Sequence, residues 1–158
     1  MTTATMDVAA FLEARRDEIL SSALAQVERT RLSHYEAAGL DVTAERLREL
    51  FDRLVQSARV RNVDAVRAYG DELGSARRRE GYDLSEVQAV INVLEESVWR
   101  AITSGVPAED LAYALGIVST ILGAAKDRLA CAYVSASSAT PVKTIHLEEL
   151  FSGTENLG

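Results

Sequence analysis

The sequence has few of the residue types that build disulfides, zinc sites and haem sites. Its 158 residues include one cysteine, Cys131, and two histidines, His34 and His146. A single cysteine cannot close an internal disulfide, and zinc needs a cluster of cysteines or histidines. A haem domain of this size needs an axial ligand on a helix in its second half, where no histidine precedes His146. We therefore expect no metal and no cofactor, both histidines on the surface, and Cys131 as a small packing residue.

The chain also lacks the composition of a nucleic-acid-binding or membrane protein. Its 24 acidic and 17 basic residues give a net charge of −7, which disfavours contacts with phosphates. Residues 1–7 have no basic residue and no apolar segment, unlike a signal peptide. A bilayer span needs about 20 apolar residues, and the longest uncharged run of the helical region, Leu111 to Ala125, is shorter. We expect a cytoplasmic protein that binds neither nucleic acid nor membranes.

Catalytic signatures are missing as well. The sequence has no glycine-rich phosphate-binding loop, no serine nucleophile elbow and no His-Glu-x-x-His zinc motif. Neither histidine is placed by sequence to activate Cys131 as a nucleophile. We therefore expect no catalytic residue and no enzymatic activity.

Helical periodicity extends along most of the sequence. Apolar residues recur at spacings of three and four, and no alternating run or hairpin turn predicts a strand. Residues 1–136 are predicted to form an all-α bundle of about five helices, and residues 137–158 a mobile tail. The expected helices are about Val8–Arg31 (after Asp7 as N-cap), Ala44–Arg61 (after Thr43), Val63–Arg79, Leu84–Ser104 and Pro107–Ser135, with a loop over Ser33–Val42.

The best-marked boundary lies between the third and fourth expected helices. Gly81 suits the left-handed position that ends a helix, and Asp83 with Glu86 forms the pattern of a capping box. Gly70 and Gly74 weaken the third helix by propensity. These residues place a turn at 80–83.

The fifth expected helix is apolar over a wide arc. One line of apolar residues along this helix, which we call the seam, repeats at intervals of three and four residues, as in a coiled coil. The helix is therefore either central in the bundle or packed on a second subunit. We favour a homodimer through the last two helices. The interface residues are then Leu111, Leu115, Val118, Leu122, Leu129 and Trp99, although Trp99 fits partly buried packing equally well.

Three further groups are candidate binding residues. Arg77, Arg78 and Arg79 offer an anion or partner contact, or else a solvated last helical turn. Tyr82 and Tyr113 could line a pocket, although core and boundary packing is the commoner role. The tail carries a short amphipathic segment that could dock in a groove through Leu147, Leu150 and Phe151.

The segment Ala76–Val87 combines a helix that ends in basic residues, a Gly-aromatic-Asp-Leu turn and the acidic start of a long helix. With Phe11–Ile19, it resembles the N-terminal domain of RsbRD-type RsbT co-antagonist proteins, over about Val8 to Ala136. The resemblance implies a helical regulatory domain of bacterial signalling without catalysis of its own, often joined to STAS or histidine-kinase output domains. That family often has a histidine among the polar residues before the arginines, where this chain has Gly70, Asp71 and Glu72.

Together these features predict a non-enzymatic regulatory or sensory module that acts through protein–protein contacts in bacterial signalling or stress response. The alternative is a helical domain that binds a small apolar ligand in a pocket rimmed by Tyr82, Tyr113 or Trp99.

Overall fold

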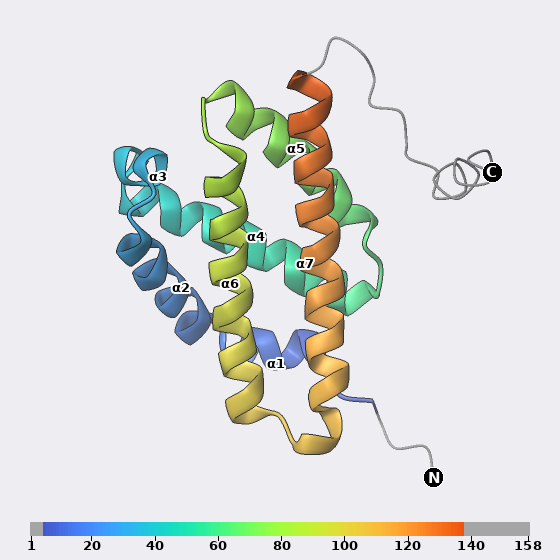
Figure 1. Cartoon of the computed structure of the whole chain (residues 1–158). Helices are drawn as coiled ribbons and strands as arrows, with labels where there is room; N and C mark the ends of the chain where they lie inside the picture. The colour runs from blue at the N-terminus through green and yellow to red at the C-terminus, as the bar shows by residue number, and fades with distance from the viewer. Residues whose placement is uncertain (1–4, 138–158) are drawn as a thin grey trace, which may run out of the picture.

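The computed structural model describes residues 5–137, and this part of the chain is made of seven α-helices without a strand (Figure 1). The all-α prediction is confirmed, whereas the predicted number of about five helices is too low. The tail segment with Leu147, Leu150 and Phe151 lies outside the described residues. The helices are α1 (Val8–Ala14), α2 (Arg16–Thr30), α3 (Ser33–Ala38), α4 (Leu40–Val60), α5 (Asp64–Arg79), α6 (Leu84–Gly105) and α7 (Ala108–Ser137).

The first expected helix is two helices, α1 and α2. Asp7 caps α1, because its Oδ1 accepts a hydrogen bond from the amide of Ala10 (3.0 Å). The helix then breaks at Arg15, whose amide donates to the carbonyl of Leu12 (3.1 Å), a tighter turn than in an α-helix. The change of direction lets α1 pack on α4, while α2 packs on both α4 and α6.

A further helix, α3, occupies the predicted loop Ser33–Val42. Gly39 separates it from α4, with a φ of 94° that favours glycine. Because α4 already begins at Leu40, Thr43 lies inside the helix, and its hydroxyl donates to the carbonyl of Gly39 (3.1 Å). The prediction of Thr43 as an N-cap is therefore wrong.

The helices α6 and α7 lie side by side and antiparallel, and α4 crosses behind them (Figure 1). The closest helix contact joins α5 and α7, where α5 carries Gly70 and Gly74. A Cβ atom at Gly70 would lie 2.8 Å from the carbonyl oxygen of Ala125, and one at Gly74 would lie 2.6 Å from the Cβ of Ala132. These glycines are therefore needed for close packing, which their low helix propensity had obscured.

The predicted seam of α7 faces the chain's own core. Val118, Leu122 and Leu129 are fully buried, and Leu111 and Leu115 are half-buried. Because α5 and α6 already cover the buried residues, they are not free to form a subunit interface. The interface prediction is therefore wrong for these three residues, and the structure favours the reading in which α7 is central.

In residues 5–137, one helical segment, Ala108–Ala136, is long and apolar enough to cross a membrane by length and composition (mean hydropathy 1.3). The core helix of a globular domain passes the same test. Of the most apolar window in this segment 28% is buried, along the seam that faces the core.

Candidate functional site

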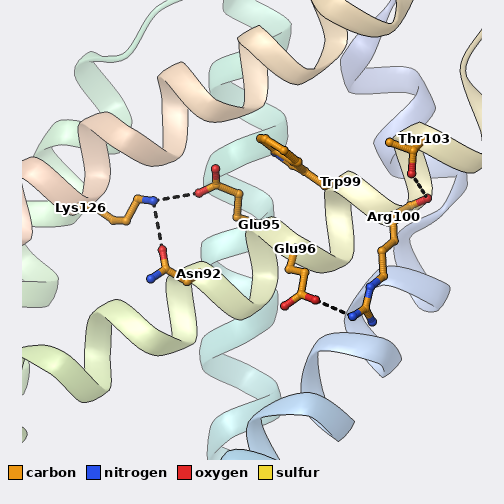
Figure 2. Close-up of a pocket in the computed structure, with 7 residues that line it drawn as sticks. All are labelled: Asn92, Glu95, Glu96, Trp99, Arg100, Thr103 and Lys126. Carbon is orange, nitrogen blue, oxygen red and sulfur yellow. Dashed lines mark hydrogen bonds and ion pairs between the residues drawn. The ribbon is translucent and has the colours of Figure 1, made fainter. Parts of the chain in front are cut away.

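The face formed by α6 and α7 carries a hollow of about 480 Å³, which we call the Trp99 surface (Figure 2). Trp99 is the chain's single tryptophan, and 42% of it is exposed. Asn92, Glu96, Arg100 and Thr103 around it are exposed as well among the described residues. The surface is lined by Asn92, Glu95, Glu96, Trp99, Arg100, Thr103 and Lys126.

Helical spacing places these residues on the outer side of α6. Asn92, Glu96, Trp99 and Thr103 follow one another at intervals of three and four residues, so they share one stripe of the helix. The opposite stripe, which includes Leu94, is buried in the core. The amphipathic pattern of α6 therefore leaves the indole ring at the surface.

Two ion pairs flank Trp99. The Nζ of Lys126, from α7, lies 2.9 Å from Glu95 Oε2 and donates to Asn92 Oδ1 (3.1 Å). Arg100 pairs with Glu96 one turn along α6. Figure 2 shows Trp99 and Glu95 directed toward α7, and Glu96 and Arg100 on the other side of α6. With two acids and two bases, the Trp99 surface has no net charge.

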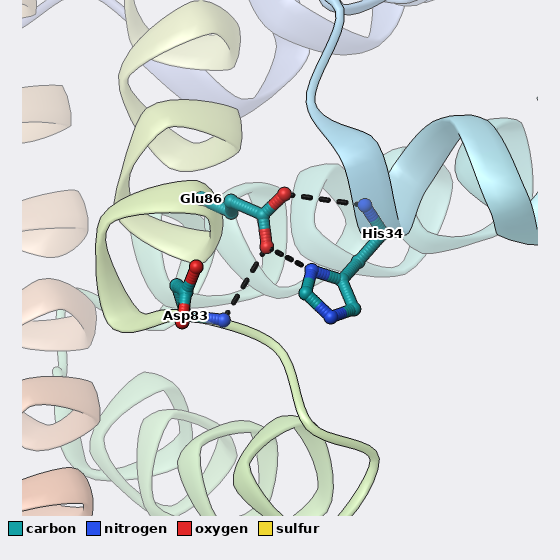
Figure 3. Close-up of side chains that lie close together, drawn as sticks. All are labelled: His34, Asp83 and Glu86. Atoms are coloured by element: carbon teal, nitrogen blue, oxygen red, sulfur yellow. Dashed lines mark hydrogen bonds and ion pairs between the residues drawn. The ribbon is translucent and has the colours of Figure 1, made fainter.

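A second polar group lies where α3 and α6 begin, and it centres on Glu86 (Figure 3). Glu86 is only 7% exposed. Its Oε1 accepts hydrogen bonds from Ser33 Oγ and from the amide of His34, both at 3.2 Å. Its Oε2 lies 2.5 Å from Nδ1 of His34 and accepts from the amide of Asp83 (3.3 Å). One carboxylate therefore caps the first turns of two helices.

The hydrogen bonds change the ionisation of Glu86. Burial alone would raise its pKa, but the hydrogen bonds from His34, Asp83 and Ser33 outweigh burial and hold the pKa below its ordinary value. The charged carboxylate is therefore the stable form in the folded chain.

His34, Asp83 and Glu86 also lie close enough to be considered as metal ligands, with one ligand atom each within 4.8 Å of the others. The carboxylates already have partners, however. Glu86 accepts the four hydrogen bonds above, and the side chain of Asp83 accepts from the amide of Glu86 in the capping box. Helix capping accounts for this cluster without an ion.

Tyr82 and Tyr113, the two tyrosines predicted as pocket residues, lie far apart. Tyr82 is 7% exposed, and its hydroxyl accepts from Nη1 of Arg46 and donates to the carbonyl of His34. Its own carbonyl accepts from the hydroxyl of Tyr133 on α7 (2.8 Å). Tyr113 lies 20 residues earlier on α7, about 30 Å along the helix. Tyr113 lines two hollows at its end of α7, whereas Tyr82 is packed in the core.

The three arginines at the end of α5 do not form one patch. Arg77 is 8% exposed and pairs with Glu80 (3.1 Å), so the prediction of a solvated arginine is wrong there. Arg78 donates to the carbonyl of Ala136 (2.7 Å). Arg79 is exposed, and it is the one arginine of the three that has no partner among residues 5–137. The prediction of Cys131 as a packing residue is wrong, because Cys131 is exposed, whereas His34 keeps 38% of its side chain exposed while it pairs with Glu86.

Sequence reasoning missed the bridging role of Glu86. The capping box predicted its contact with Asp83, but no sequence signal pairs it with His34, 52 residues away. The exposure of Trp99 was one of two readings of its position beside the buried stripe.

No protein-family model, curated protein or solved structure matches the chain. The resemblance to the RsbRD-type domain stays a prediction.

Proposed function

We propose that this chain is a non-enzymatic, cytoplasmic regulatory module of bacterial signalling or stress response that acts through protein–protein contacts. A second copy of the chain docks on the Trp99 surface. The observation that carries the proposal is the chain's single tryptophan, 42% exposed beside a hollow that α6 and α7 line. Tryptophan is enriched among the residues that dominate binding energy at interfaces.

Charge favours a second copy as the occupant. A chain with net charge −7 repels its own copies over most of its surface. The Trp99 surface is locally neutral, with Glu96 and Arg100 exposed side by side. In a two-fold symmetric pair the same patch meets itself, so each Glu96 can face the other chain's Arg100.

Charge-reversed variants test this arrangement. In Glu96→Arg the residues at positions 96 and 100 are both basic, and in Arg100→Glu they are both acidic. In a symmetric pair of either variant, like charges therefore face each other. We expect each to weaken self-association by about tenfold or more, a cost of about 1.4 kcal/mol. An equimolar mixture of the two restores pairing, because the basic patch of one chain meets the acidic patch of the other. Sizing with light scattering measures all three samples.

Matched controls separate this contact from net charge. Glu45→Arg and Arg48→Glu make the same charge changes at an exposed ion pair on α4, away from the Trp99 surface. We expect both control chains to associate as the wild type does. A mixture of the α6 variants that stays monomeric, or single variants that still pair, would contradict the proposed arrangement.

A further inference from the structure

A separate cavity of about 340 Å³ lies between the end of α4, the start of α5 and the first half of α7. We call it the α4–α7 cavity. It lies apart from the Trp99 surface and shares no residue with it. Its volume falls at the lower end of the range for small-molecule pockets.

The wall of the α4–α7 cavity is mostly apolar. Val63 comes from the start of α5, and Tyr113, Ile117 and Ile121 come from one side of α7. Gly116 also lines the cavity, and a Cβ atom at this position would meet no atom within 4 Å. The space beside Gly116 is therefore open, and an apolar group that fills it gains burial.

Two polar side chains at the end of α4 lack partners. Ser57 is fully buried, and its hydroxyl has no hydrogen-bond partner. Arg61 follows one helical turn later and makes no ion pair or hydrogen bond among residues 5–137. Both residues line the cavity.

Two arginines and two aspartates lie at or near the cavity mouth, so their formal charges balance. Arg59 lines an adjoining hollow that shares Tyr113 and Ile117 with the cavity. Asp7 lines that hollow too, but its carboxylate caps α1. Asp64 lies exposed in the first turn of α5. Arg61 is therefore the cationic group that the cavity itself presents.

We propose that the α4–α7 cavity binds a small apolar carboxylate. The carboxylate lies at the end of α4, where the Arg61 guanidinium donates to it, and the apolar body packs against Tyr113, Ile117 and Ile121. This assignment does not depend on self-association through the Trp99 surface.

Titration of the full chain with phenylpropionate tests the proposal, with phenethylamine, which has the same phenyl ring and two methylenes, as the probe of opposite charge. We expect phenylpropionate to raise the melting temperature with concentration, because it binds the folded state. The amine gives a smaller shift. In amide NMR spectra the perturbed signals belong to Val63, Gly116 and Ile117. The absence of a melting shift with phenylpropionate, or equal shifts with both probes, would overturn the proposal.

Paired variants locate the binding. Gly116→Leu fills the open space in the cavity and is expected to abolish the shift. Gly123→Leu is its control, because Gly123 has the same open surroundings on α7 but lies outside this cavity. Both changes raise helix propensity, so both chains are expected to fold. Binding that survives in Gly116→Leu, or is lost in both variants, would overturn the assignment to this cavity.

A second pair tests the arginine. Arg61→Gly removes the guanidinium and suits the left-handed backbone there, where φ is 52°. Arg31→Gly is its control, because Arg31 ends α2 with a φ of 51°. We expect Arg61→Gly to weaken phenylpropionate binding two- to fivefold and to remove the preference over the amine. A preference that survives in Arg61→Gly would overturn the assigned role of Arg61.

Discussion

Glu86 shows how one side chain can join segments that are distant in sequence. Its two oxygens satisfy donors at the starts of α3 and α6, and its neighbours Tyr82 and Arg46 extend the network to α4. Buried polar groups of this kind cost free energy when a partner is removed, because the remaining groups are left unsatisfied.

Replacing Glu86 with glutamine is expected to lower the free energy of unfolding by about 2 kcal/mol at neutral pH, because charged acceptors make the stronger hydrogen bonds. Urea titrations of the wild type and Glu86→Gln measure the difference. Glu96→Gln is the control, since Glu96 lies on the same helix with an exposed side chain. A loss in the control as large as in Glu86→Gln would show that the buried network contributes nothing.

The same residue predicts a pH dependence. Because the pKa of Glu86 is lower in the folded chain than its ordinary value, the unfolded chain binds the proton first as the pH falls. The stability that Glu86 contributes is complete above its ordinary pKa of about 4.3 and is lost as the pH falls through the lower folded value. We expect acid to destabilise the wild type more than Glu86→Gln in urea titrations below about pH 5. Equal acid sensitivity of the two chains would contradict this role.

Single residues were also where sequence reasoning was least secure. The buried stripe of α6 could be predicted because Val87, Ile91, Leu94 and Val98 repeat at helical spacing. The burial of Arg77 and the exposure of Cys131 could not, because both depend on which helix lies opposite. A one-dimensional pattern does not contain that information.

At the scale of elements, the contact between α5 and α7 depends on two glycines. Gly74→Ala places a Cβ atom against Ala132, so we expect it to lower the free energy of unfolding by about 1–3 kcal/mol. Gly123→Ala on α7 is the control. Its Cβ meets no atom within 4 Å, so the gain in helix propensity should stabilise the chain by up to about 1 kcal/mol. Chemical denaturation measures both, and stabilisation in Gly74→Ala would contradict the close packing.

Helix positions were largely predictable from residue 64 onward. Asp83, Gly81 and Pro107 are chemical signals of helix ends, and α5, α6 and α7 lie close to their predicted ranges. The break at Arg15 had no such signal, because neither glycine nor proline marks it. It results from packing, since both helices contact α4 but α2 also packs along α6. Tertiary contacts set such a break, and local propensity does not reveal it.

At the scale of the whole molecule, the described helices form one core, and most of the α7 seam lies within it. Sequence alone could not decide between a core helix and a subunit interface, because both leave the same apolar pattern. The structure moves the proposed interface outward, from the seam to the Trp99 surface. It leaves the α4–α7 cavity on another side of α7 for a small ligand.

The solution mass of the full chain, measured by light scattering over a range of concentrations, tests the central claim most directly. The chain has a mass of 17.2 kDa. We expect the wild type to approach twice that mass, Trp99→Ala to shift toward the single-chain mass, and Val60→Ala, at an exposed position on α4, to behave as the wild type. A wild type that keeps the single-chain mass at every concentration, or a Trp99→Ala chain that pairs as well as the wild type, would contradict the account.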